Sequence, residues 1–143
     1  MGREIRRVPE GWEHPKDANG HYQPLYDATY LARLKNIVRH ELPYYLRHPR
    51  HLRELFECLP DRAYCRPGWR KGEATHYQIY ENVSDGTPVS PVFATLGNLR
   101  TWLIDEGYSY KAIENFVKYG YALSMVMSQG KIAMGIHSAE MMQ

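Results

Sequence analysis

The chain has 143 residues, a hydrophobic fraction of 43%, a charged fraction of 24% and a formal net charge of +2, which are ordinary values for one globular domain. No stretch reaches the roughly 20 apolar residues that a membrane-spanning helix needs, and the charged N-terminus lacks the apolar segment of a signal peptide. These features exclude a membrane partner. The 12 tyrosines indicate either an aromatic rim around a small core or a contact surface.

The charges are distributed unevenly along the chain. Residues 28–71 carry ten Lys/Arg against four acids, a net +6, whereas residues 1–27 carry −1 and residues 72–143 carry −3. The middle third is therefore a basic segment between two slightly acidic ones.

The first 27 residues predict an edge strand followed by an ordered arm. Residues 3–8 alternate weakly, and Pro9 ends the strand because it cannot donate to a sheet. Residues 9–27 are too rich in proline and glycine for a helix and too aromatic for disorder. We expect Trp12, Tyr22 and Leu25 to hold this arm, with a turn at residues 17–20.

Two amphipathic helices are predicted in the basic segment. Asp27 is the expected N-cap of the first, which should end near residues 41–42 because Pro43 follows. Its apolar face comprises Leu31, Leu34, Ile37, Val38 and Leu42. The second helix should begin at Pro49 and end before Pro60, with Leu52, Leu55, Phe56 and Leu59 on one face.

A strand over residues 76–83 and a shaped loop follow. The period-two pattern of Tyr77, Ile79 and Val83 is typical of a half-buried strand. Glycine and proline then restrict the backbone of the loop, which comprises Ser84, Asp85, Gly86, Thr87 and Pro88. A short extended segment through residue 93 completes this stretch.

The last third predicts two helices and a hairpin. Thr95 and Ser109 are the expected N-caps, and Gly107 and Gly120 the expected ends. The buried faces should comprise Leu99, Trp102 and Leu103 in one helix and Ala112, Phe116 and Val117 in the other. Residues 121–136 predict a β-hairpin around Gln129–Gly130, with a helical start over 121–127 as the alternative, and residues 137–143 form a frayed tail.

These elements together predict an α+β fold, with about four helices packed on a small antiparallel sheet built from residues 3–8, 76–83 and 121–136. The single domain, 1–143, would comprise an ordered arm (1–27), a basic helical segment (28–72), a scaffold (73–136) and the tail (137–143).

Catalytic and metal-binding patterns are weak. His48 and His51 have helical spacing but no third ligand at a diagnostic distance, so we expect no metal and no cofactor. Cys58 and Cys65 fit neither a redox pair nor a zinc site and are expected as free, partly buried thiols, with a disulfide as the less favoured alternative. Neither Ser84 nor Ser90 lies in a sequence motif that marks a catalytic nucleophile. We therefore expect a protein that is not an enzyme.

Arginines and aromatic residues alternate in the basic segment. Guanidinium groups grip phosphates or carboxylates, and interleaved aromatic rings can stack on bases. The alternative is a solvated helix face with local ion pairs, such as Arg50–Glu54 and Arg53–Glu57. We call this set the basic/aromatic belt; it comprises Arg39, Tyr44, Tyr45, Arg47, Arg50, Arg53, Arg62, Tyr64, Arg66, Trp69 and Arg70.

Two stretches resemble a group of small, poorly characterised phage and prophage proteins. One is Gly2–Pro9 with Trp12, His14-Pro15, Tyr22 and Pro24-Leu25; the other is Thr75–Glu81 with Ser84–Val92 and the helix that holds Trp102-Leu103. This chain departs from the group at Leu96-Gly97-Asn98, where relatives have a proline and acids. The resemblance implies a phage gene product in the bacterial host cytoplasm, with both ends forming a shared scaffold.

Three functional hypotheses follow. The first is a non-enzymatic phage protein that engages and inhibits a host protein or ribonucleoprotein machine, such as a CRISPR-type defence nuclease, through the basic/aromatic belt. The second is a phage accessory protein that binds DNA or RNA or assists virion assembly. The third and weakest is a small hydrolase or transferase that uses the loop from Ser84 to Ser90.

Overall fold

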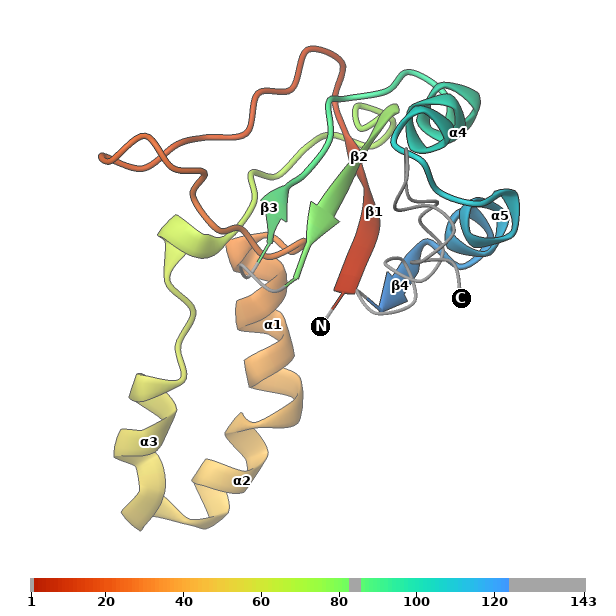
Figure 1. Ribbon diagram of the computed structural model, residues 1–143. Coiled ribbons are helices and arrows are strands. Elements are labelled where there is room, and N and C mark those ends of the chain that lie inside the picture. The colour runs from red at the N-terminus through yellow and green to blue at the C-terminus, as the bar shows by residue number, and fades with distance from the viewer. Residues whose placement is uncertain (1, 83–85, 124–143) are drawn as a thin grey trace. The chain divides into compact units, whose positions relative to one another are not determined.

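The computed structural model describes residues 2–82 and 86–123 (Figure 1). The chain divides into two compact units. The sheet unit comprises Met1–Gln23 and Trp69–Gln143, and the helical unit comprises Pro24–Gly68. Five α-helices and four strands lie in the described residues, which confirms the α+β class.

The helical unit begins with α1, Tyr30–His40. The prediction that Asp27 caps this helix was wrong: Thr29 is extended and its hydroxyl accepts from the Ala32 N–H at 3.1 Å. Asp27 lies two residues too early for that geometry, and its carboxylate accepts from Arg66 Nε at 3.0 Å instead. The predicted end of the helix is confirmed, since Glu41 is its C-cap.

The segment after α1 forms a second helix that was not predicted from the sequence. Helix α2, Leu42–Arg47, holds Pro43 in its first turn, where a helix needs no backbone donor. Pro49–His51 forms the 3-10 helix η1, α3 follows as Leu52–Glu57, and Arg62–Tyr64 forms the 3-10 helix η2. Of the predicted apolar face only Leu55 is buried, and Leu52, Phe56 and Leu59 are exposed.

The sheet unit contains one antiparallel sheet with the strand order β3-β2-β1-β4. Its strands are β1 (Gly2–Val8), β2 (His76–Glu81), β3 (Thr87–Pro88) and β4 (Tyr121–Leu123). The first confirms the predicted strand at 3–8, and the second confirms a strand that begins at residue 76 but ends at Glu81, earlier than the predicted residue 83. Residues 121–123 are strand rather than helix, and the remainder of the predicted hairpin and the tail lie outside the described residues.

Two capped helices follow β3 in the chain. Helix α4, Leu96–Asp105, begins at Thr95, and α5, Tyr110–Tyr119, begins at Ser109, because each hydroxyl accepts a first-turn backbone N–H. Gly120 closes α5 with φ 77°, a left-handed conformation that favours glycine. These predicted caps are confirmed.

One face of the sheet packs against α4 and α5 to form the core (Figure 1). Ile5 faces Ile79 in the register of β1 and β2, and successive side chains on a strand point to opposite faces. The fully buried members of this core include Leu99, Leu103 and Phe116. Ile113 is buried in α5, and Ala112, which was predicted to face inward, is only half-buried.

The arm covers the other face of the same sheet (Figure 1). Its predicted turn is confirmed: the Gly20 N–H donates to the Asp17 carbonyl at 3.0 Å, and Gly20 has φ 82°. The Asp17 carboxylate accepts from the backbone N–H groups of Asn19 and His21. This turn returns the chain so that Lys16 pairs with Tyr22.

Candidate functional site

The helical unit exposes the apolar stripe of α1. Leu31 is 59% exposed and Val38 is 57% exposed. Together with Leu34, Lys35 and Arg39 they line a shallow depression of about 520 Å³. We call these five residues the α1 surface; it combines apolar side chains with two cationic ones.

A different side of α1 faces α3. Ala32, Arg33 and Ile37 line a cavity of about 340 Å³ together with Cys58, which follows α3. Because each helical residue advances by 100°, this side lies roughly opposite Leu31 and Val38. Leu31 and Val38 therefore lie outside this cavity and remain exposed.

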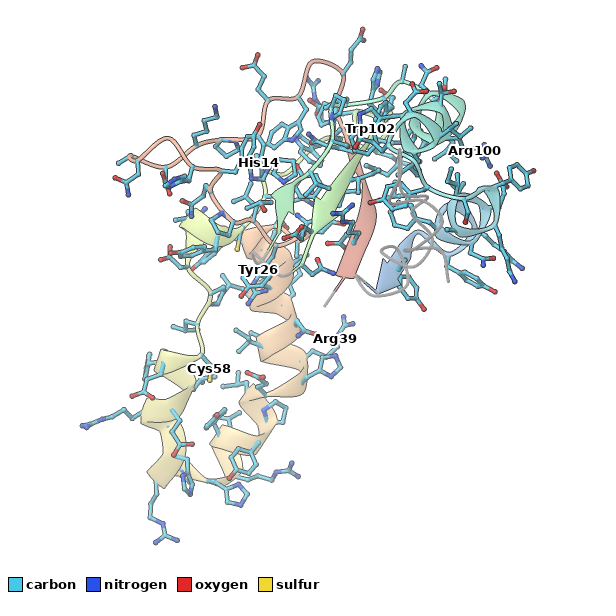
Figure 2. The ribbon with its side chains drawn as sticks, in the orientation of Figure 1. His14, Tyr26, Arg39, Cys58, Arg100 and Trp102 are labelled. Carbon is cyan, nitrogen blue, oxygen red and sulfur yellow. The ribbon has the colours of Figure 1, made fainter. Side chains whose placement is uncertain are left out.

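The arginines of the basic/aromatic belt fall into two groups. Arg39, Arg47, Arg50 and Arg53 are exposed, and none is paired with a carboxylate in the part of the chain that the structure describes. Figure 2 shows the side chain of Arg39 on α1. The alternative ion pairs with Glu54 and Glu57 are not formed, since the Glu54 carboxylate contacts His51 Nδ1 at 3.0 Å.

The other two belt arginines in the helical unit, Arg62 and Arg66, contribute to the packing of that unit. Arg62 lies 4.1 Å from the centre of the Tyr30 ring. Arg66 pairs with Asp27 at 3.0 Å and also donates to the Pro67 carbonyl. Both arginines hold the segment after α3 to residues near the start of α1.

The aromatic members of the belt are also divided. Tyr44 stacks on His48 with the ring centres 4.3 Å apart and meets Tyr45 edge-on, while the Tyr64 carbonyl accepts from the Tyr26 N–H. Trp69 and Arg70 belong to the sheet unit, where Trp69 packs edge-on against Trp12 at 5.3 Å. The eleven belt residues therefore do not form one surface of one unit.

The shaped loop is described only in part. Ser84 and Asp85 lie outside the described residues. Gly86 is buried with φ 104°, and its N–H donates to the Glu81 carbonyl. Thr87 and Pro88 form β3, which pairs with the end of β2, so the described part of this loop shapes the sheet edge.

A hydrogen-bonded cluster that the sequence reading missed lies between the arm and the sheet. The Trp12 indole N–H donates to the Tyr80 hydroxyl at 3.1 Å, and His14 Nδ1 lies 2.9 Å from the same hydroxyl. His14 Nε2 contacts the Gln23 carbonyl, which can only accept. The proton therefore resides on Nε2, and Nδ1 accepts from Tyr80.

Burial fixes the charge state of this cluster. His14 is 7% exposed, and burial, opposed in part by the bond to Gln23 and assisted by the charge of Arg6, lowers the pKa of its imidazole. Arg6 is 6% exposed, lies 4.3 Å from the centre of the Tyr80 ring and pairs with Glu4 at 2.8 Å. The cluster thus holds a neutral imidazole beside a paired guanidinium.

A pattern in the sequence could have indicated this second covered face. Gln78 and Tyr80 alternate with the predicted core residues of β2 and are both buried. Trp12 and His14 alternate in the same way on the arm. The arm and β2 meet here, through contacts between residues 66 and 68 positions apart in the chain.

The described residues hold neither a metal-ligand cluster nor a membrane-spanning helix. Within 2–82 and 86–123, no three His, Cys, Asp or Glu side chains form a group that could hold a metal. The same ranges contain no helix with the length and apolarity to cross a bilayer. Cys58 and Cys65 are free thiols, Cys58 being more exposed than predicted.

Comparisons with known protein families, with curated proteins and with solved structures find no match to this chain.

Proposed function

We propose that this chain is a non-enzymatic binding protein that engages another protein through the α1 surface. The observation that carries the proposal is the exposure of Leu31 and Val38, at 59% and 57%, on a helix whose other side lines a cavity with Cys58. An isolated exposed leucine needs no explanation, but a stripe at helical spacing lined by cations resembles the apolar centre and charged rim of a protein interface.

The composition of the α1 surface favours a protein over a nucleic acid as the partner. Nucleic-acid sites are dominated by phosphate contacts, which need cations and gain little from aliphatic side chains. Here Leu31, Leu34 and Val38 outnumber Lys35 and Arg39. The complementary partner surface is an apolar patch bordered by Asp or Glu.

The phage resemblance supplies the proposed setting of this interaction. We propose that the chain is phage-encoded, acts in the host cytoplasm and inhibits a host machine by covering a surface that the machine needs for its activity. A CRISPR-type defence nuclease is the machine to test first, because such nucleases present functional protein surfaces that a small protein can block. The exposed Arg39, Arg47, Arg50 and Arg53 would steer association with an acidic target.

Capture from host lysate with two matched variants tests this function. The wild-type chain should retain one host protein in stoichiometric amount, and the double variant Leu31→Asp/Val38→Asp should lose it. Leu46→Asp is the matched control, because Leu46 is 68% exposed on α2 and lies outside the α1 surface. Equal capture by all three proteins, or no capture by the wild type, contradicts the proposal.

Nucleic-acid binding is a second candidate, favoured by the four exposed arginines without a carboxylate partner in the described residues. It predicts a mobility shift with DNA or RNA at low salt and a steep loss of affinity as salt rises. The charge-removing variant Arg50→Gln/Arg53→Gln should weaken that shift, whereas Leu31→Asp/Val38→Asp should have little effect. The two candidates thus respond to different substitutions in the same unit.

A further inference from the structure

The helical unit exposes a second apolar stripe, which the proposed protein interface does not use. This stripe, the α3 stripe, comprises Leu52, Phe56 and Leu59, which are 39%, 65% and 44% exposed. Their spacing of four and then three residues places them along one side of the helical segment. Leu55, by contrast, is 8% exposed. The segment therefore buries one apolar side chain and presents three to solvent.

Two charges of opposite sign border the α3 stripe on its open flank. Arg53 and Glu57 each follow a stripe residue by one position, so both lie about 100° around the helix in the same direction. The buried Leu55 precedes Phe56 and lies on the opposite flank. Both charged side chains are exposed, and neither forms an ion pair within residues 2–82 and 86–123. The open flank thus offers one cation and one anion, four positions apart.

This order of charges is complementary to its own reverse. When two copies of a helix lie antiparallel across a twofold axis, the same flank of each copy meets, and every contact occurs twice. An axis level with Leu55 puts Arg53 of each copy beside Glu57 of the other. The same register brings the two Phe56 rings near the axis, with the leucines of each stripe on either side. One placement therefore matches both the apolar side chains and the charges.

The α1 surface lacks this self-complementarity. Its charged residues are Lys35 and Arg39, both cations, so two copies of it would repel each other. In η1 and α3 two arginines stand against two glutamates, which gives no electrostatic preference for a strongly acidic or basic partner. The charges thus distinguish the two stripes: one suits a different protein with an acidic rim, and the other suits a copy of itself.

We propose that the α3 stripe joins two copies of this chain in an antiparallel, twofold-symmetric dimer. Leu52, Phe56 and Leu59 form its apolar centre, and two Arg53–Glu57 pairs border that centre. Three apolar side chains from each copy make a small interface, so the dimer is weak, with a dissociation constant on the order of 100 µM.

Analytical ultracentrifugation of the full chain measures this association. From about 10 µM to about 1 mM, the average mass of the wild type should rise toward twice the mass of one chain. Phe56→Asp should stay monomeric, because it places two carboxylates near the axis. The matched control is Ile104→Asp, since Ile104 is 57% exposed on α4 in the sheet unit, and this variant should associate as the wild type does. Circular dichroism checks that each variant is folded.

A charge-swap series tests the antiparallel register. Arg53→Glu and Glu57→Arg each create two like-charge contacts in the dimer, and each should raise the dissociation constant at least about tenfold. An equimolar mixture of these two variants has opposite charges at both contacts and should associate about as tightly as the wild type. The double variant Arg53→Glu/Glu57→Arg should do so by itself. Damage to the fold by a single substitution would not be repaired by mixing.

Three outcomes overturn the proposal. They are a wild-type chain that stays monomeric up to about 1 mM, a folded Phe56→Asp variant that still associates, and charge-swap variants that behave alike alone and mixed. If Phe56→Asp does not fold, the charge swaps decide, because both of their sites are exposed. Capture of a host protein that depends on Phe56, without self-association, would assign the stripe to another partner and also contradicts the dimer.

The dimer and the proposed host interaction can be separated experimentally. Leu31→Asp/Val38→Asp changes only the α1 surface, so it should lose the host protein and dimerise as the wild type does. Phe56→Asp should show the reverse behaviour. Failure of either proposal therefore leaves the other standing.

Discussion

The two units of this chain use their apolar residues in opposite ways. The sheet unit buries Leu99, Leu103, Ile113 and Phe116 to 1% exposure or less. The helical unit buries only Leu25 and Leu55 below a tenth and leaves its best amphipathic stripe in solvent. Amphipathic helices thus contribute to a core in one unit and to an exposed surface in the other.

This difference shows that an apolar stripe on a helix can form either a buried core face or an exposed surface. A stripe lowers the free energy of the folded state only when something covers it. In the sheet unit, the sheet supplies the cover for α4 and α5. In the helical unit, α1 is in contact with α2, but Leu31 and Val38 remain more than half exposed, so the stripe is available to a partner.

The largest expected effect comes from the core of the sheet unit. Phe116 is 0% exposed, so Phe116→Ala should reduce the free energy of unfolding by about 3–5 kcal/mol through lost transfer energy and a new cavity. Denaturant titration followed by tryptophan fluorescence measures the loss. A reduction below about 1 kcal/mol would contradict the assignment of Phe116 to the core.

The contacts of the arm are the next test. Tyr80→Phe removes the hydroxyl that joins Trp12 to His14 and should cost about 1–3 kcal/mol, because it leaves buried polar groups unpaired. The same titration checks this value. Tyr119→Phe is the control, since Tyr119 is 60% exposed and should change stability little.

The lowered pKa of the His14 imidazole predicts that the stability of the sheet unit depends on pH. Burial lowers its folded pKa below 6.5, so the unfolded state binds the extra proton first. The stabilising contribution is fully present above pH 6.5 and is lost as the pH falls through 6.5 toward the folded pKa. Thermal melts from pH 8 to 5 should show this loss in the wild type and a flatter profile in His14→Asn.

The smallest effect on stability is expected from the α1 surface. Leu31→Ser/Val38→Ser changes side chains that are more than half exposed, so the free energy of unfolding should change by less than about 1 kcal/mol in total. Partner capture should nevertheless fail. A large loss of stability would mean that this stripe has a structural role. The contrast between buried stripes in the sheet unit and an exposed stripe in the helical unit would then no longer hold.

Local signals in the sequence predicted the local structure well. Thr95 and Ser109 cap their helices, and Gly120 ends α5, because capping depends on residues within one turn. The structural role of Pro43 was harder to predict from the sequence. Its ring blocks continuation of α1, yet the same ring suits the first turn of α2, and only the structure distinguishes the two uses.

Long-range features could not be predicted in the same way. The α1 periodicity correctly places Leu31 and Val38 on one face, but periodicity carries no information about what covers that face. The bonds from Trp12 and His14 to Tyr80 join residues more than 60 positions apart. The belt is divided between the two units because Trp69 and Arg70 follow Gly68, where the helical unit ends.

The bond from the Trp12 indole to Tyr80 has a practical consequence. An indole proton held in this way exchanges with deuterium only when the arm lifts from the sheet, and it gives an isolated signal far from the backbone amides in a nitrogen-correlated spectrum. That single resonance would report how often the arm separates from the sheet.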